Sequence, residues 1–124
     1  IMDTPSKSAV ALAHLRLSVT NLSEAVEFFE AIGARADTRR EGFTVVELHD
    51  RTRLQLTQTN AKISSENFLQ FDFKVDNIDE ARQDFCNKGL NPSQIVRRNP
   101  GHDSFTLIGP DHCEVKINSG FNRK

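Results

Sequence analysis

The chain has 124 residues, of which 37% are apolar and 27% are charged, and its net charge is −1. This length suits one compact domain, and the near-neutral charge argues against a general nucleic-acid or membrane-surface binder, which needs a basic excess. No apolar run approaches the ~20 residues of a membrane-spanning helix. Residues 1–11, expected to be flexible, lack the apolar core of a signal peptide. We therefore expect a cytoplasmic protein.

Residues 12–19 (LAHLRLSV) are the first predicted strand. Apolar and polar side chains alternate along them, which is typical of a half-buried strand. The two faces are Leu15, Leu17 and Val19 against His14, Arg16 and Ser18.

A helix is predicted directly after this strand. Asn21 and Glu24 have the spacing of a capping box, in which the Asn side chain accepts a hydrogen bond from a free backbone N–H. Gly33 stands where a left-handed residue ends the helix. The apolar stripe expected to face the core is Leu22, Ala25, Val26, Phe29 and Ile32.

The same pattern returns 56 residues later. Residues 68–75 (FLQFDFKV) alternate as a second strand, Asn77 and Glu80 repeat the capping box, and Gly89 repeats the terminal glycine. The later strands recur too, because FTVV at 43–46 matches FTLI at 105–108, and LQL at 54–56 matches VKI at 115–117. The sequence therefore contains a duplicated unit.

Each unit reads strand, helix and then two or three strands. One such unit leaves a sheet face open, and two units related by a pseudo-two-fold axis can cover it. We therefore predict an α+β fold of two tandem βαβββ modules, with helices outside and a curved mixed sheet around a cavity. The first module spans 12–57, a polar linker 58–67, the second module 68–118 and a C-terminal tail 119–124.

The two cysteines, Cys86 and Cys113, do not form a ligand-spaced cluster. A thiolate metal site is therefore not expected, and both are interpreted as thiols that fill the core.

These features resemble the vicinal oxygen chelate superfamily, which includes glyoxalase I, extradiol dioxygenases and bleomycin-resistance proteins. The resemblance covers residues 12–118 and is carried by the doubled module, the opening at 12–29 and the closing GPDHCEVKI at 109–117. This closing segment looks like the motif D-P-x-G-x-x-x-E-[LI], with which members of the family end. The resemblance implies a homodimer that uses its cavity, with modules paired either within a chain or across two chains.

The resemblance also implies a divalent metal held by the first and last strand of each module. The matching positions here are His14, Gln55, Gln70 and Lys116. Gln70 stands in place of the usual His, and Lys116 in place of the usual Glu. Because an ammonium offers no lone pair and repels a dication, we expect no metal and no other cofactor. A slip of two residues in the last strand would instead place Glu114 at the ligand position.

The predicted cavity wall is strongly polar. Its charges either pair with one another, so that the sheet is only a scaffold or an interface, or they face a polar or anionic ligand. His14 is a wall residue, an acid–base group beside Glu114, or a remnant of a metal site. His102, with Arg97 or Arg98, lies in a predicted loop at 97–104 that could cover the cavity. The candidate ligand-binding residues are His14, Arg16, Gln55, Gln70, Asp72, Lys74, Lys116 and His102.

Three functions remain open at this point. The first is metal-independent binding of a small polar or anionic molecule, as the resemblance to bleomycin-resistance proteins suggests. The second is a metal-dependent lyase, isomerase or dioxygenase of the same superfamily. The third is a protein-interaction module, which predicts that no ligand-sized cavity exists.

Overall fold

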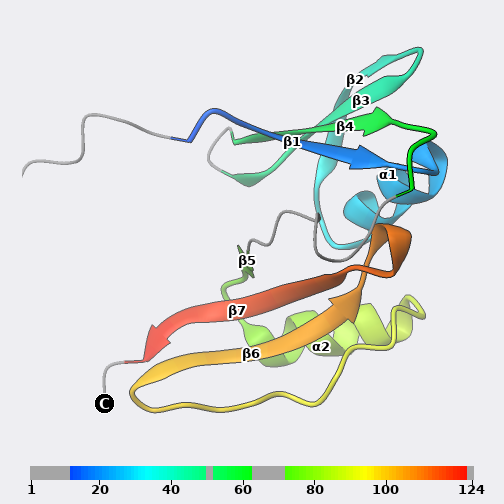
Figure 1. Ribbon diagram of the computed structural model, residues 1–124. Coiled ribbons are helices and arrows are strands. Elements are labelled where there is room, and N and C mark those ends of the chain that lie inside the picture. The colour runs from blue at the N-terminus through cyan, green and yellow to red at the C-terminus, as the bar shows by residue number, and fades with distance from the viewer. Residues whose placement is uncertain (1–11, 50–51, 63–71, 123–124) are drawn as a thin grey trace, which may run out of the picture.

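The computed structural model describes residues 12–49, 52–62 and 72–122, and these form two β-sheets and two α-helices (Figure 1). Sheet A has the order β1-β4-β3-β2 and sheet B the order β5-β7-β6. The expected flexible residues 1–11, the linker residues 63–67 and Gln70 lie outside the described ranges. The elements are β1 (His14–Val19), α1 (Leu22–Ala31), β2 (Arg35–Arg40), β3 (Phe43–Glu47), β4 (Arg53–Gln58), β5 (Asp72–Lys74), α2 (Ile78–Asn87), β6 (Gly101–Ile108), the short 3₁₀ helix η3 (Pro110–His112) and β7 (Glu114–Asn122).

Both helices begin and end as their sequences predict. The side chains of Asn21 and Asn77 accept hydrogen bonds from the backbone N–H of Glu24 and Glu80, at 3.1 and 3.0 Å. Each helix is followed by a glycine with positive φ, Gly33 at 117° and Gly89 at 78°. These are conformations that side chains with a Cβ rarely adopt.

The strand pairing repeats between the modules. In each module the first strand runs parallel to the last, β1 beside β4 and β5 beside β7. Between α2 and β6 the described chain makes an isolated bridge, Val96 with Ser104, where the first module has the full strand β2. Strand β7 continues to Asn122, beyond residue 118, where the sequence places the end of the second module.

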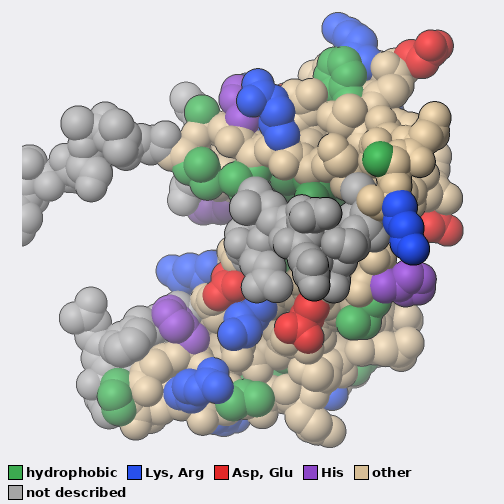
Figure 2. Space-filling model, in the orientation of Figure 1, with side chains coloured by type: hydrophobic (Ala, Val, Ile, Leu, Met, Phe, Trp, Pro, Cys, Tyr) green, Lys and Arg blue, Asp and Glu red, His purple; other side chains and the backbone are tan. Residues whose placement is uncertain are grey.

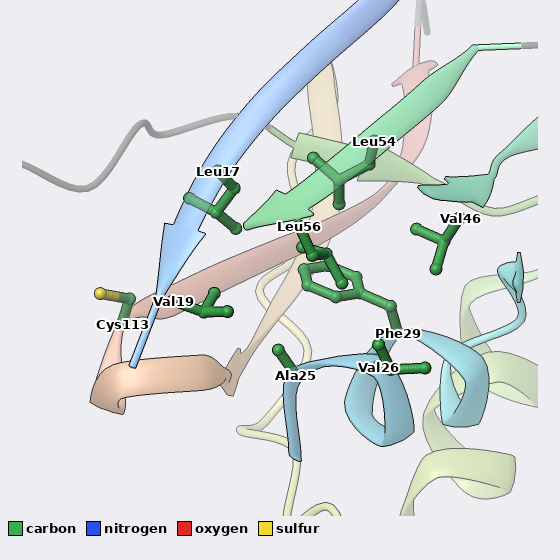
Figure 3. Packing of buried hydrophobic residues seen from close by; sticks show 9 residues of the cluster. All are labelled: Leu17, Val19, Ala25, Val26, Phe29, Val46, Leu54, Leu56 and Cys113. Atoms are coloured by element: carbon green, nitrogen blue, oxygen red, sulfur yellow. The ribbon is translucent and has the colours of Figure 1, made fainter. Parts of the chain in front are cut away.

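Each sheet packs one face against its helix. In sheet A, Leu17, Val19, Leu54 and Leu56 are buried against the α1 side chains, among them Phe29 (Figure 3). In sheet B, the helix α2 contributes Ile78 and Phe85 to a second cluster that includes Leu107, Val115 and Ile117. The alternation of apolar side chains thus correctly predicts which face of each sheet is buried.

One aromatic pair strengthens the core of sheet B, and one cysteine departs from its predicted environment. Phe105 is buried and meets Phe85 edge-on, with 5.9 Å between ring centroids. Cys86, expected in the core, is exposed, whereas Cys113 is buried as predicted. Cys86 lies on α2 outside the positions that reach the sheet, and an amphipathic helix leaves such positions in water.

The two modules meet through their helix-covered sides. Phe28, Ile32 and Phe73 pack against both apolar clusters, and the rings of Phe29 and Phe73 lie 6.0 Å apart. At the helix ends, Lys88 Nζ donates to the backbone oxygen of Ala31 at 2.7 Å. Because the modules share their apolar sides, the polar face of each sheet is turned away from this shared core.

No helix in the described parts of the chain has the length and apolar character needed to cross a membrane.

Candidate functional site: the polar faces of the two sheets

The polar face of sheet A is built by the two parallel strands β1 and β4. His14 lies directly opposite Arg53, Arg16 opposite Gln55, and Ser18 opposite Thr57, so these six side chains share one face. His14, Arg16 and Ser18 are exposed, and the β4 residues are half-buried. The Gln55 amide nitrogen donates to the hydroxyl of Thr57 at 3.5 Å.

A charge network occupies the β2 side of this face. Arg53 Nε lies 3.1 Å from Asp37 Oδ2, and its Nη2 lies 3.8 Å from Glu47 Oε2. Glu47 also pairs with Arg35 across β2 and β3. Asp37 reaches the network because it is the extra residue of a β-bulge between Ala36 and Thr38. Sequence alternation misses this residue, because a bulge shifts the side-chain parity without a signal in the apolar pattern.

The polar face of sheet B carries mixed charges. Asp72 lies opposite Lys116, and Lys74 lies opposite Asn118. The Asp72 carboxylate accepts a hydrogen bond from Asn118 Nδ2 at 3.1 Å. Figure 2 shows basic, acidic and histidine side chains gathered over β7 and β6 on this face.

Arg16, Lys74 and Lys116 form no ion pair in residues 12–49, 52–62 and 72–122, and the same holds for Arg40 of β2. The cations that the ion pairs of these ranges engage are Arg35, Arg39, Arg53, Lys88 and Arg97. The predicted mutual pairing of the wall charges is therefore not what the described part of the chain shows. The ion pairs on sheet A join side chains of β2, β3 and β4 instead.

The two modules have the same strand register. Arg16 lies opposite Gln55 in the first module, and 56 residues after Arg16, Asp72 lies opposite Lys116 in the second. Lys116 is therefore the structural counterpart of Gln55. The alternative register, which would put Glu114 in this position, does not occur. Glu114, the first residue of β7, is exposed and pairs with Ile108.

The described residues at the metal positions that the resemblance implies fit a divalent ion poorly. His14 and Gln55 supply one imidazole and one amide, and each is the register partner of an arginine, Arg53 and Arg16 respectively. Lys116 supplies an ammonium, which cannot ligate a metal. Within the ranges that the structure describes, no group of three or more His, Cys, Asp or Glu side chains could hold a metal ion.

His102 and the two arginines are not arranged as the predicted loop. Strand β6 begins at Gly101, so His102 lies in a strand, where it is exposed. Arg97 is held at the surface by Asp79 at 2.6 Å and Asp103 at 3.3 Å. The hydrogen bond that Arg97 donates to the Asp79 carboxylate raises the pKa of the Arg97 guanidinium, with a further contribution from the carboxylate charge. Neither Arg97 nor His102 lines the cleft that the described residues form between the two modules.

A cleft of about 620 Å³ lies between the modules, on the sides that the helices cover. It is lined mainly by apolar side chains, and of the candidate ligand-binding residues only Asp72 and Lys74 border it. The predicted cavity between two polar faces is thus not the one formed here, because the modules join by their apolar sides. We call this space the inter-module cleft, and its walls include Leu15, Ile32, Ala34, Phe73, Phe85 and Ile117.

Solved structures share this architecture at low sequence identity. The bleomycin resistance determinant encoded on transposon Tn5 matches with a TM-score of 0.72 at 13% identity, over 90% of this chain and 98% of that chain. The lactoylglutathione lyase from Agrobacterium tumefaciens matches with a TM-score of 0.73 at 19% identity, over 92% of this chain and 96% of that chain. This chain has the vicinal oxygen chelate fold.

A third similar structure is a glyoxalase/bleomycin resistance protein/dioxygenase from Alicyclobacillus acidocaldarius, with a TM-score of 0.71 at 17% identity over 94% of this chain and 96% of that chain. No family model matches the sequence, and no curated protein does. The vicinal oxygen chelate fold expected from the duplicated module is confirmed. The neighbours differ in activity, so the fold alone assigns none to this chain.

Proposed function

We propose that this protein binds a small polar or anionic molecule on the polar faces of its sheets, without a divalent metal. The observation that carries the proposal is that Arg16 and Lys116 are exposed cations without an ion-pair partner in the described ranges. They belong to equivalent strand pairs of the two modules, in which Arg16 lies opposite Gln55 and Lys116 lies opposite Asp72. Guanidinium and ammonium groups in this state are available to a carboxylate or phosphate.

A homodimer is part of the proposal. Each polar face is open on one side because the modules of one chain join by their apolar sides. A second copy could bring the sheet A face of one chain against the sheet B face of the other. An anion between Arg16 and Lys116 would then offset the repulsion between two desolvated cations. The expected cytoplasmic location also belongs to this proposal.

Isothermal titration with inorganic phosphate and with mono- and dicarboxylates tests the proposal, and light scattering on the same samples reports the oligomeric state. We expect Arg16→Ala and Lys116→Ala each to weaken binding about tenfold or more, since a charge-assisted hydrogen bond contributes about 1.5–3 kcal/mol. Arg39→Ala is the matched control, because Arg39 is an exposed cation that pairs with Glu30 away from this face.

Equal weakening by all three variants would show only a general charge effect and would overturn the proposal. Turnover of a hydroxycarbonyl or catechol substrate that requires added Ni²⁺ or Fe²⁺ would favour the metal-dependent enzyme instead. Absence of both anion binding and turnover would leave the interaction module as the better hypothesis.

A further inference from the structure

The inter-module cleft differs from the polar faces of the sheets, although Asp72 and Lys74 of the sheet B face also border it. It opens between the helix-covered sides of the two modules, whereas Arg16 and Lys116 lie on the opposite sides of their sheets. Its volume of about 620 Å³ falls within the range of small-molecule sites, ~300–1,000 Å³. The cleft is therefore large enough to hold a ligand of its own.

The walls of the cleft are apolar. Leu15 and Ile32 line it from the first module, and Phe73, Phe85 and Ile117 line it from the second. Phe85 and Ile117 are otherwise buried core residues, so the deepest part of the cleft reaches the core of sheet B. Water in such a space finds few hydrogen-bond partners, and an apolar group that displaces it gains free energy.

The rim of the cleft is polar, and its two carboxylates outnumber its one ammonium group. Asp72, Lys74 and Asp76 lie along β5 and its end, and Thr52 and His49 lie on the opposite rim. Asp76 is exposed, and the described part of the chain gives its carboxylate no ion pair. Two carboxylates against one ammonium favour a ligand whose polar end donates hydrogen bonds or carries positive charge.

We propose that the inter-module cleft binds a small, mainly apolar molecule that ends in an amino group. The apolar part lies against Phe73, Phe85 and Ile117, and the ammonium lies at the rim beside Asp76. This site does not depend on the binding proposed for the polar faces. The ligand proposed for the cleft is mainly apolar and cationic, whereas the one proposed for the polar faces is polar or anionic. An experiment can therefore contradict either proposal without contradicting the other.

The fluorescence of N-phenyl-1-naphthylamine, which increases in apolar surroundings, measures binding to the cleft in the full chain. We expect saturable binding of one probe per chain. Ala34→Phe and Thr52→Trp each place a larger side chain in the cleft and should weaken probe binding about tenfold, about 1.4 kcal/mol. Ala61→Phe adds the same group as the first variant at an exposed loop position outside the cleft and should leave binding unchanged.

Competition by two probes of equal chain length tests the charge at the rim. We expect n-octylamine to displace the fluorescent probe at a concentration about fivefold lower than n-octanoate, as for an exposed ion pair. Asp76→Asn should remove most of this preference. Arg16→Ala should leave both binding and preference unchanged, because Arg16 lies on the other side of sheet A.

Three results would overturn the proposal. The first is that no saturable probe binding occurs. The second is that binding survives both Ala34→Phe and Thr52→Trp, or is lost in Arg16→Ala, which would place the probe elsewhere. The third is that n-octanoate competes as well as n-octylamine, which would exclude an amine-bearing ligand. Thermal unfolding of each variant shows whether it is folded, and two filling variants guard against the failure of one.

Discussion

Thr20 holds Asp111 through two hydrogen bonds. The backbone N–H of Thr20 donates to Asp111 Oδ2 at 3.1 Å, and its hydroxyl donates to Asp111 Oδ1. Thr20 follows β1 in the first module, and Asp111 lies in η3 between β6 and β7 of the second. One carboxylate thus joins segments 91 residues apart in the chain and links the two modules at the end of the shared core.

We expect Asp111→Ala to lower the free energy of unfolding by about 1–3 kcal/mol. The change leaves two donors of Thr20 without their acceptor, and alanine is poorly suited to the φ of 56° at this position. Asp111→Asn keeps one acceptor oxygen and tolerates the left-handed conformation, so it should lose about half as much or less. Urea unfolding at neutral pH measures both. A loss no larger than that of Glu114→Ala, an exposed acid nearby, would show that the link contributes nothing.

The two N-cap asparagines give a prediction about the helices. Asn21→Ala and Asn77→Ala should each destabilise the protein by about 1 kcal/mol, because each removes the acceptor for a backbone N–H in the first turn. Asn21→Asp and Asn77→Asp keep that acceptor and should be nearly neutral. Chemical unfolding followed by circular dichroism gives the comparison. If alanine and aspartate behave alike at either site, the cap does not stabilise that helix.

The two cysteines should differ in reactivity. Cys86 is exposed, whereas burial raises the pKa of the Cys113 thiol, and the charge of Asp111 raises it further. Because the thiolate is the reactive form, a disulfide reagent should label Cys86 rapidly and Cys113 only on unfolding. Cys86→Ser and Cys113→Ser assign the two phases. Rapid labelling of Cys86→Ser in native conditions would contradict the burial of Cys113.

The same pKa shift predicts a dependence of stability on pH. Since the folded protein keeps the proton of Cys113 at higher pH than the unfolded chain does, the contribution of this thiol is full below its ordinary pKa. It is lost as the pH rises above that value and through the raised pKa. Stability measured from neutral to alkaline pH should therefore fall less in Cys113→Ala than in the unsubstituted protein.

Metal content tests the interpretation of Lys116. After incubation with Ni²⁺, Zn²⁺, Mn²⁺ or Fe²⁺ and removal of free ions, we expect much less than one tightly held ion per chain by plasma mass spectrometry. Lys116→Glu replaces the ammonium by a carboxylate and should increase retention. About one ion per unsubstituted chain, lost in His14→Ala, would show that the polar faces hold a metal after all.

Local features of this fold could be predicted from the sequence because they depend on neighbouring residues. Each of these features depends on residues only a few positions apart in the chain. They are the Asn-x-x-Glu caps, the glycines Gly33 and Gly89 after the helices, and the alternation along residues 12–19. The repeat at a spacing of 56 residues indicated the duplicated module, and the equal register of Arg16–Gln55 and Asp72–Lys116 agrees with it. Even the position of Lys116, which limits any metal site, could be predicted in this way.

The tertiary structure decided how the two modules meet. Alternation shows which face of a strand is apolar, but it does not show whether two modules join by their polar or by their apolar faces. Here Phe28, Ile32 and Phe73 are shared between the two clusters, because burying apolar surface is the dominant stabilising term. Because the modules join by their apolar sides, His14, Arg16 and Lys116 lie on the outer faces of the sheets, and the inter-module cleft forms between the modules. The bulge that brings Asp37 to Arg53 and the exposure of Cys86 depend likewise on packing between segments distant in the chain.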